Sequence, residues 1–425
     1  MKIFDIISLL IFCSGLFIFI NTFFLKLPSS IGLMVLALIL SLGVLTFSIL
    51  FPEYHLAQHV KQYDFTDVMY RFVLSVMLFA TALKIDFRKL GNQLIPVLML
   101  SFFGVLISTF VIGTIMFFLL DFTGNGISFI SCLVFGALIS STDPIAITKT
   151  IRQYDLSKKL ETKISGESLL NGGIAIVLAY SLVNVQQEAI SQGMFTTWDV
   201  SFIFLRDIIG GLVVGVLFGW LGFKLLKLID NDVVEAEVLI TLALVMMGSY
   251  LGDSLSVSSM MVAILTGLII GNYGRSETGE SAVGEYVYKF WRLIEETLAA
   301  MLFVLIGFEM LVIPLRLDYF AIGFFAVVVV IFARWLSVFI PIKLMSKRRT
   351  FDQGTISVLS WGAIRGGLPV AFTLSLAPGF EGKEIIVTLT YVVVVCSILY
   401  QGLSTTTLMK QYESNNSRKS KLSSA

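Results

Sequence analysis

The chain has 425 residues, of which 56% are hydrophobic and only 14% are charged, and its mean hydropathy is +0.90. A soluble domain is about 45–50% apolar and about 25% charged, so this composition excludes a soluble enzyme and predicts an integral membrane protein with many spans. The net charge of +1, without a basic stripe, gives no indication of a nucleic-acid partner. The three cysteines each stand alone in an apolar run, which predicts neither a disulfide framework nor a zinc site.

A helix needs about 20 apolar residues to cross a bilayer, and this length divides the chain into about thirteen candidate spans. In chain order they lie at about 4–24, 31–51, 68–86, 94–120, 127–150, 164–184, 200–228, 234–252, 256–273, 293–313, 319–345, 355–378 and 385–409. The expected fold class is therefore an all-α polytopic membrane protein. We expect one membrane domain over residues 1–410 and a polar, disordered cytoplasmic tail at 411–425.

Positively charged residues gather at alternate ends of these spans. The basic ends include Lys158, Lys159, Lys163, Lys347, Arg348 and Arg349, whereas the opposite ends carry only Lys61, Arg71, Arg316 and Lys383. Loops rich in lysine and arginine stay in the cytoplasm. The sequence thus predicts a multi-pass protein of the plasma or inner membrane, with its N-terminus outside and its C-terminus in the cytoplasm.

Two of the spans contain helix-breaking sequences. The fifth contains Ser141-Thr142-Asp143-Pro144, in which Thr142 or Asp143 can cap a helix and Pro144 fits the first turn that follows. The twelfth contains Trp361-Gly362-Ala363-Ile364-Arg365-Gly366-Gly367-Leu368-Pro369, a run with several weak helix formers. Two discontinuous spans in opposite halves of the chain predict inverted repeats with a site between the two breaks.

Asp143 and Thr142 are the first candidates for this site. A charged group near the middle of a membrane costs about 2.5–3.5 kcal/mol on insertion scales, so its presence there indicates an ion pathway. We expect Asp143 to bind a cation or carry a proton, and Thr142 to contribute a backbone or hydroxyl oxygen. The alternative for Asp143 is a cap that only stabilises the break.

The sixth span supplies a polar stripe. Glu167 and Asn171 are four residues apart and share a helix face, and Ser168 lies beside them. Carboxylate, hydroxyl and amide oxygens suit a hard cation, so Ser168 and Asn171 are expected ion ligands. The alternative for Asn171 is a hydrogen bond between helices. Gly172 lies one turn after Ser168 on the same helix face. Because it has no side chain, the polar stripe ends there.

An arginine inside a membrane needs a partner. Arg365 lies in the break of the twelfth span, and we expect it to form a structural ion pair with Glu167, which assigns the ion-binding role to Asp143. Arg334 lies inside the eleventh span, and we expect it to be paired structurally as well.

Seven segments together resemble the monovalent cation/proton antiporters of the NhaP and eukaryotic sodium/proton exchanger type. They are Met77-Leu78-Phe79 through Asp86-Phe87-Arg88, Ser141-Thr142-Asp143-Pro144, Gly166-Glu167-Ser168-Leu169-Leu170-Asn171, Phe303-Val304-Leu305-Ile306-Gly307, Ala333-Arg334-Trp335-Leu336-Ser337-Val338, Trp361-Gly362-Ala363-Ile364-Arg365-Gly366 and Ser397-Ile398-Leu399-Tyr400-Gln401-Gly402-Leu403. Each segment is a weak signal alone, but their order and spacing are specific.

The resemblance implies an antiporter fold and a homodimer in the lipid bilayer. A core, about 94–184 and 319–410, would move in an elevator-like cycle against a dimerisation scaffold, about 1–90 and 200–313. The implied ion site consists of Asp143, Ser168 and a backbone oxygen of Thr142, with Glu167 paired to Arg365. Na+ or K+ would compete with H+ for this site, and neither a cofactor nor a bound metal beyond the transported cation is implied.

Gly172 departs from the family pattern, because the family normally has an aspartate after the asparagine, and that aspartate is its main ion and proton carrier. Asp143 could have taken over the carrier role, the exchange could be lost, or the chain could be an altered or inactive variant. The leading function is therefore Na+ or K+/H+ antiport. The alternatives are a gated or leaky cation conductance and a transport-inactive sensor or effector, with no regulatory subunit identified by the sequence.

Overall fold

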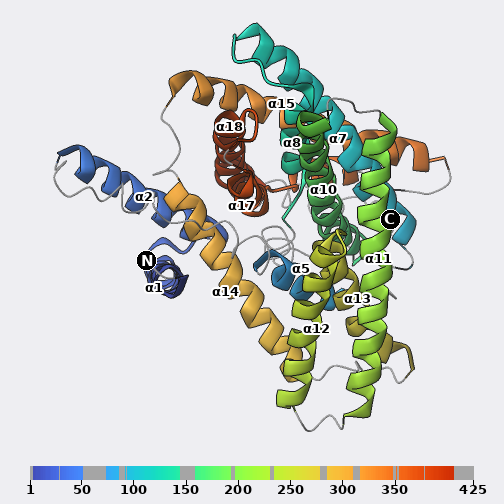
Figure 1. Cartoon of the computed structure of the whole chain (residues 1–425). Helices are drawn as coiled ribbons and strands as arrows, with labels where there is room; N and C mark the ends of the chain where they lie inside the picture. Colours follow the sequence, from blue (N-terminus) through green and yellow to red (C-terminus); the bar gives the residue numbers. More distant parts are fainter. Residues whose placement is uncertain are drawn as a thin grey trace, which may run out of the picture. The chain divides into compact units, whose positions relative to one another are not determined.

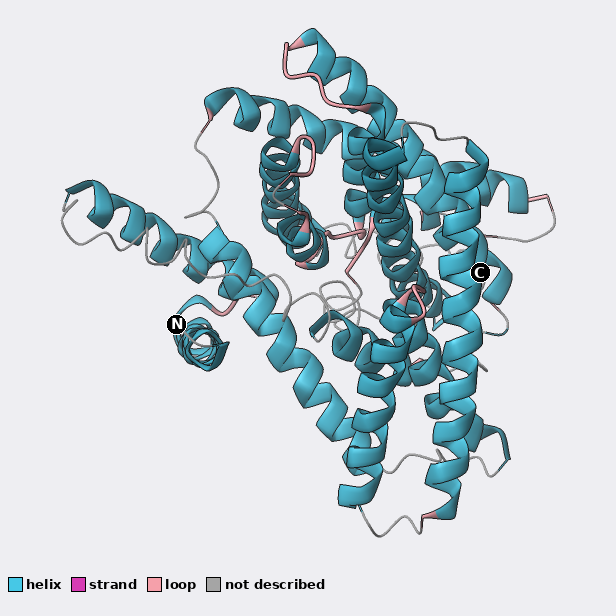
Figure 2. Ribbon diagram, viewed as in Figure 1, coloured by secondary structure: helices cyan, strands magenta, loops and turns pink. Residues whose placement is uncertain are grey.

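A computed structural model describes residues 3–27, 29–50, 73–85, 91, 93–143, 158–192, 197–229, 234–277, 285–309, 316–347, 351, 354–377 and 379–405. This part of the chain contains helices, turns and loops and no strand (Figure 2). The all-α prediction is therefore confirmed. The expected tail at 411–425 and the expected helix restart after Asp143 lie outside the described residues.

Each expected span overlaps a helix in the described part of the chain, and Figure 1 shows the helices in chain order. The α-helices are α1 (Ile3–Ile20), α2 (Ser29–Leu50), α5 (Leu74–Leu83), α7 (Leu94–Phe122), α8 (Phe129–Ser140), α10 (Lys158–Gln192), α11 (Thr197–Leu228), α12 (Val234–Ser254), α13 (Ser259–Glu277), α14 (Glu285–Glu309), α15 (Leu317–Met345), α16 (Thr355–Trp361), α17 (Leu368–Ser375) and α18 (Lys383–Cys396). Two π-helical turns, η1 (Asn21–Leu25) and η4 (Ser397–Gln401), extend α1 and α18. Within the described ranges, seven helical stretches are long and apolar enough to cross a membrane, and the other apolar helices are shorter.

The chain divides into two compact units. Unit 1 comprises Met1–Phe87, Gln187–Leu315 and Val370–Phe380, and unit 2 comprises Arg88–Gln186, Arg316–Pro369 and Glu381–Ala425. The expected scaffold coincides largely with unit 1 and the expected core largely with unit 2, apart from the short segment Val370–Phe380. The roles of the two units, dimerisation and movement, stay predictions.

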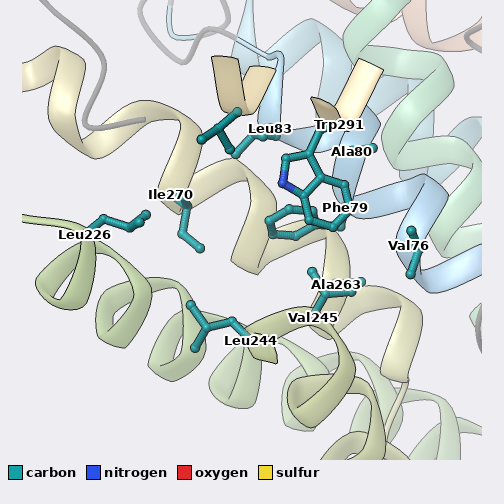
Figure 3. Close-up of a cluster of buried hydrophobic side chains, with 11 residues drawn as sticks. Val76, Phe79, Ala80, Leu83, Leu226, Leu244, Val245, Ala263, Ile270 and Trp291 are labelled. Atoms are coloured by element: carbon teal, nitrogen blue, oxygen red, sulfur yellow. The ribbon is translucent and has the colours of Figure 1, made fainter. Parts of the chain in front are cut away.

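Helix α5 lies in the core of unit 1, where nearly all of its side chains are buried. Phe79 on α5 packs against Trp291 on α14 with ring centroids 4.7 Å apart (Figure 3). The indole nitrogen of Trp291 donates a hydrogen bond to Thr241 on α12 at 3.0 Å. A buried tryptophan needs such an acceptor, so one side chain ties three helices together.

Close helix packing elsewhere in unit 1 depends on glycine. The glycines of α11, among them Gly211, Gly215 and Gly219, face α13 so closely that a Cβ atom at Gly215 would lie 2.7 Å from Leu265 and 3.1 Å from the carbonyl oxygen of Val262. Helices in lipid gain little from burying apolar surface and associate through such close contacts. The glycine pattern therefore explains why α11 and α13 lie side by side along their length.

Unit 2 is built around α7, α8, α10, α15 and α18. Helices α7 and α8 meet where Gly136 faces the backbone of α7, since a Cβ atom at Gly136 would lie 2.6 Å from the carbonyl oxygen of Thr109. Near one end of the unit, apolar residues of α7, α10, α15 and α16 form a buried cluster: Leu100, Leu160, Ile164, Val338, Ile342, Val358 and Leu359. This cluster packs α10 and α16 against α7 and α15 within unit 2. The candidate site lies in the same unit, at the end of α8, on α10 and in the break that follows α16.

Candidate functional site

The first helix break follows Ser140. Helix α8 ends there, and Ser141 turns the chain into an extended conformation with ψ of 144°. The hydroxyls of Ser140 and Ser141 donate to the carbonyl oxygens of Ala137 and Leu138 at 2.7 and 2.9 Å. These bonds satisfy carbonyl groups that the end of a helix leaves without partners, and they allow α8 to stop inside an apolar environment.

The second break separates α16 from α17. Residues 362–367 are not helical, and the carbonyl oxygen of Ile364 accepts a hydrogen bond from the backbone N–H of Asp143 at 2.9 Å. The two breaks therefore contact each other through their backbones. The expected meeting of the two breaks is thus observed between the described end of the first break and the second break. The backbone N–H of one break satisfies a carbonyl oxygen of the other.

Asp143 lies at this contact and is buried, with only 5% of its surface exposed. Its carboxylate lies against Gly366, where an added Cβ atom would coincide with the carboxylate. Gly366 is therefore required for space. It lies two residues before α17, whose N-terminal end favours a negative charge. The break thus supplies both room and electrostatic support for the carboxylate.

Arg365 follows Ile364 at this contact, and its side chain donates to backbone carbonyl oxygens. Its Nε donates to the carbonyl oxygen of Ile139 in the last turn of α8 at 3.3 Å, and its Nη1 donates to the carbonyl oxygen of Ala363 at 2.8 Å. Its backbone N–H donates to the Ser397 hydroxyl at 3.0 Å, where the π-helical turn η4 begins. A cation at the C-terminal end of a helix offsets the partial negative charge of the carbonyl groups there.

The expected ion pair between Glu167 and Arg365 is wrong, because Glu167 pairs with Arg334. The two guanidinium nitrogens Nη1 and Nη2 of Arg334 donate to the two carboxylate oxygens of Glu167 at 2.7 and 2.9 Å. Nη2 also donates to the carbonyl oxygen of Leu359 at 3.0 Å. Both charged side chains are almost fully buried. This two-point geometry is the strongest pairing open to a carboxylate, and Arg365 instead satisfies backbone carbonyls.

Asn171 connects this ion pair to the first break. Its amide nitrogen donates to Glu167 Oε1 at 3.1 Å and to the hydroxyl of Thr142 at 3.2 Å. With both N–H groups engaged, the amide oxygen is buried and accepts no hydrogen bond from any described residue. The arrangement fixes the direction of the amide, so its oxygen is available as a ligand for a cation.

Ser168 and Gly172 complete the expected stripe on α10, and both are buried. A Cβ atom at Gly172 would lie 3.8 Å from the carbonyl oxygen of Thr142 and 3.9 Å from the Leu368 side chain, which are ordinary contact distances. The Cβ atom of a larger side chain at position 172 would therefore fit without a clash, and it would lie beside the carbonyl oxygen of Thr142.

The structure thus links Thr142, Glu167 and Asn171 by hydrogen bonds and places Asp143 and Gly172 next to Thr142. Sequence reasoning missed the identity of the arginine that holds Glu167. The signal was present, because Arg334 is a charge in the middle of the long apolar helix α15 and such a charge needs a carboxylate partner. Which carboxylate it meets depends on helix packing.

The profile of the family described as sodium/hydrogen exchanger, transmembrane, matches residues 8–411. The chain is 38% identical over 414 residues to the Na(+)/H(+) antiporter NhaP of Pseudomonas aeruginosa, with 96% of each chain covered. It is 29% identical to the Na(+)/H(+) antiporter NhaH of Halobacillus aidingensis, over 91% of this chain and 92% of that protein. A structure of the sodium proton antiporter MjNhaP1 from Methanocaldococcus jannaschii at pH 8 superposes with a TM-score of 0.76 at 18% identity, covering 96% of this chain and 97% of the other.

The fold and the paired helix breaks define a multi-pass, all-helical membrane transporter. The chain belongs to the sodium/hydrogen exchanger family, which consists of secondary transporters and not of enzymes. The family resemblance read from the sequence is therefore confirmed.

Proposed function

We propose that this chain exchanges Na+ for H+ across the membrane and that Asp143 holds the two ions in turn. The observation that carries the proposal is the buried Asp143 carboxylate, where the chain that follows α8 contacts the break between α16 and α17. A bound cation favours the ionised form of a carboxylate, and a bound proton removes the charge that attracts the cation. Competition at one group is therefore sufficient to couple the two fluxes.

We assign the ligands of the proposed cation from the polar stripe of α10 and from the family resemblance. They are the Asp143 carboxylate, the backbone or hydroxyl oxygen of Thr142, the amide oxygen of Asn171 and the hydroxyl of Ser168. Hard monovalent cations prefer such oxygens. The support for Na+ is that the relatives are named as Na+/H+ antiporters; K+ is the alternative cation.

The charges at the site set the expected stoichiometry. Glu167 and Arg334 neutralise each other, and Asp143 contributes one negative charge. Exchange of one proton for one Na+ at this carboxylate leaves the charge of the loaded site unchanged. We therefore expect one-for-one exchange that does not respond to the membrane voltage.

Gly172 favours a second candidate function. Gly172 lies next to the carbonyl oxygen of Thr142 and has no carboxylate that could hold a proton there. A site that binds cations without a competing proton would let them pass and give a passive or gated conductance, and a chain that does neither would act as a membrane sensor. Homodimerisation, movement of the core against the scaffold, an outer N-terminus and a cytoplasmic C-terminus complete the proposal.

Purified protein in proteoliposomes separates these functions. An inward Na+ gradient should drive proton efflux, read by an internal pH dye, and clamping the voltage with K+ and valinomycin should leave the rate unchanged. Asp143→Asn should abolish the exchange, whereas Gly172→Ala should retain it. Voltage dissipation by Na+ without proton movement would instead identify a conductance, and exchange that appears only in Gly172→Asp would show that the native chain is not an exchanger.

A further inference from the structure

A second polar cluster lies at the other end of α8, away from Asp143. Glu381, in the turn before α18, accepts a hydrogen bond from the backbone N–H of Ser128 at 3.1 Å and another from the amide nitrogen of Gln186 at 3.2 Å. Ser128 is the residue that caps α8, and its hydroxyl accepts from the N–H of Ser131 at 3.3 Å. The Ser131 hydroxyl donates in turn to the carbonyl oxygen of Glu381 at 3.1 Å.

We propose that Glu381 is a positioning residue that caps α8 from outside the helix and thereby holds Thr142 and Asp143 in place for cation binding. The N-terminal end of a helix carries unsatisfied N–H groups and a partial positive charge, both of which a carboxylate stabilises. The inference rests on the proposed function, because it assigns to Glu381 an effect on the cation site at the far end of the helix.

The two ends of α8 are held by charges of opposite sign. Glu381 lies at the N-terminal end, and Arg365 donates to the carbonyl oxygen of Ile139 at the C-terminal end. Each charge matches the sign that the helix dipole favours at that end. We therefore expect that loss of either contact lets the end of α8 shift, together with the residues that follow Ser140.

Gln186 takes part in the same cluster. The Gln186 amide nitrogen donates to Glu381 and to the Ser131 hydroxyl, and it leaves its own oxygen buried and without a donor among the described residues. Such an orphaned oxygen is unfavourable, so the orientation persists because the carboxylate and the hydroxyl require donors. The turn at Gly382 has φ of 75°, a conformation that suits glycine and brings Glu381 to the helix end.

A cation site at this cluster is the alternative that the geometry disfavours. Both carboxylate oxygens of Glu381 already accept N–H donors, one from backbone and one from an amide. Among the described residues no group of three or more histidine, cysteine, aspartate or glutamate side chains could hold a metal ion, so Glu381 lacks the further ligands that such a site needs.

The test compares Glu381→Gln with a matched control, Glu384→Gln. Glu384 lies three residues further along, is also exposed, and its carboxylate forms no hydrogen bond or ion pair with any described residue. Loss of a helix cap corresponds to a change of about fivefold in an equilibrium. The apparent KM for Na+ is inversely proportional to the fraction of time that α8 holds Asp143 in place. It should therefore rise in Glu381→Gln, by at most about fivefold, at an unchanged maximal rate, and Glu384→Gln should match the native chain.

A second measurement is independent of transport. Hydrogen–deuterium exchange of the peptide that covers α8 should accelerate in Glu381→Gln and not in Glu384→Gln. Gln186→Leu should raise the KM in the same direction, and its combination with Glu381→Gln should be less than additive because the two residues act as one contact. Two results would overturn the positioning role. One is an equal rate of hydrogen–deuterium exchange in all variants, and the other is faster hydrogen–deuterium exchange with an unchanged KM for Na+. Absence of transport in the native chain would instead refute the proposed function. The hydrogen–deuterium exchange rates would then still show whether Glu381 stabilises the N-terminal end of α8.

Discussion

Replacing Arg334 with methionine tests the buried ion pair on which the site rests. The change removes three hydrogen bonds, of 2.7 and 2.9 Å to Glu167 and 3.0 Å to the carbonyl oxygen of Leu359. Only 1% of Glu167 is exposed, so its carboxylate would remain buried without a countercharge. Removal of one partner from such a pair costs about 3–5 kcal/mol, and we expect a loss of this size in Arg334→Met.

The double variant Glu167→Gln with Arg334→Met separates the charge from the packing. Uncharged side chains of similar volume in place of a buried pair are often neutral or stabilising by about 1–4 kcal/mol, and a glutamine still offers Asn171 an acceptor. The double variant should therefore recover most of the stability that Arg334→Met loses. The stability of the single and the double variant is measured by thermal unfolding of the purified proteins in detergent, with size-exclusion chromatography as the readout.

Arg365→Met is the comparison that decides between the two arginines. It removes donors to two backbone carbonyl groups, Ile139 and Ala363, each worth about 1–3 kcal/mol when left unsatisfied. Glu167→Gln should rescue Arg334→Met and leave Arg365→Met unimproved. Rescue of Arg365→Met by Glu167→Gln, with Arg334→Met as stable as the native chain, would refute the assigned pair.

Three further substitutions test other contacts. Gly366→Ala should displace the Asp143 carboxylate and abolish transport while the protein still folds, and normal transport in vesicles would contradict that placement. Gly215→Leu should destabilise the packing of α11 on α13 by about 1–3 kcal/mol or more, whereas Gly43→Leu, which meets nothing within 4 Å, should leave the unfolding temperature unchanged. Glu295→Gln removes the carboxylate that pairs with Lys84, the residue that follows α5, and that accepts a hydrogen bond from Thr81 on α5. Thermal unfolding should show lower stability, and an unchanged midpoint would mean that the pair contributes nothing.

The sequence alone determined the class of protein and the positions of its helices. Apolar runs of about 20 residues have no stable place outside a membrane, so composition and length were sufficient for the spans. The breaks were also readable, because proline lacks a backbone N–H group and glycine and serine are weak helix formers. The role of Asp143 was predicted by the same reasoning, because a carboxylate inside an apolar span is costly and indicates an ion pathway.

Only the tertiary structure decided which arginine holds Glu167. Both Arg334 and Arg365 lie within predicted spans, and the sequence favoured Arg365 because it lies at a break. A break also leaves backbone carbonyl groups without partners, and those of Ile139 and Ala363 take up the Arg365 guanidinium. Arg334 lies on the continuous helix α15, whose own carbonyl groups are already engaged in the helix, so it pairs with the carboxylate of α10. The choice depends on where unsatisfied acceptors lie after packing, which spacing along the chain does not encode.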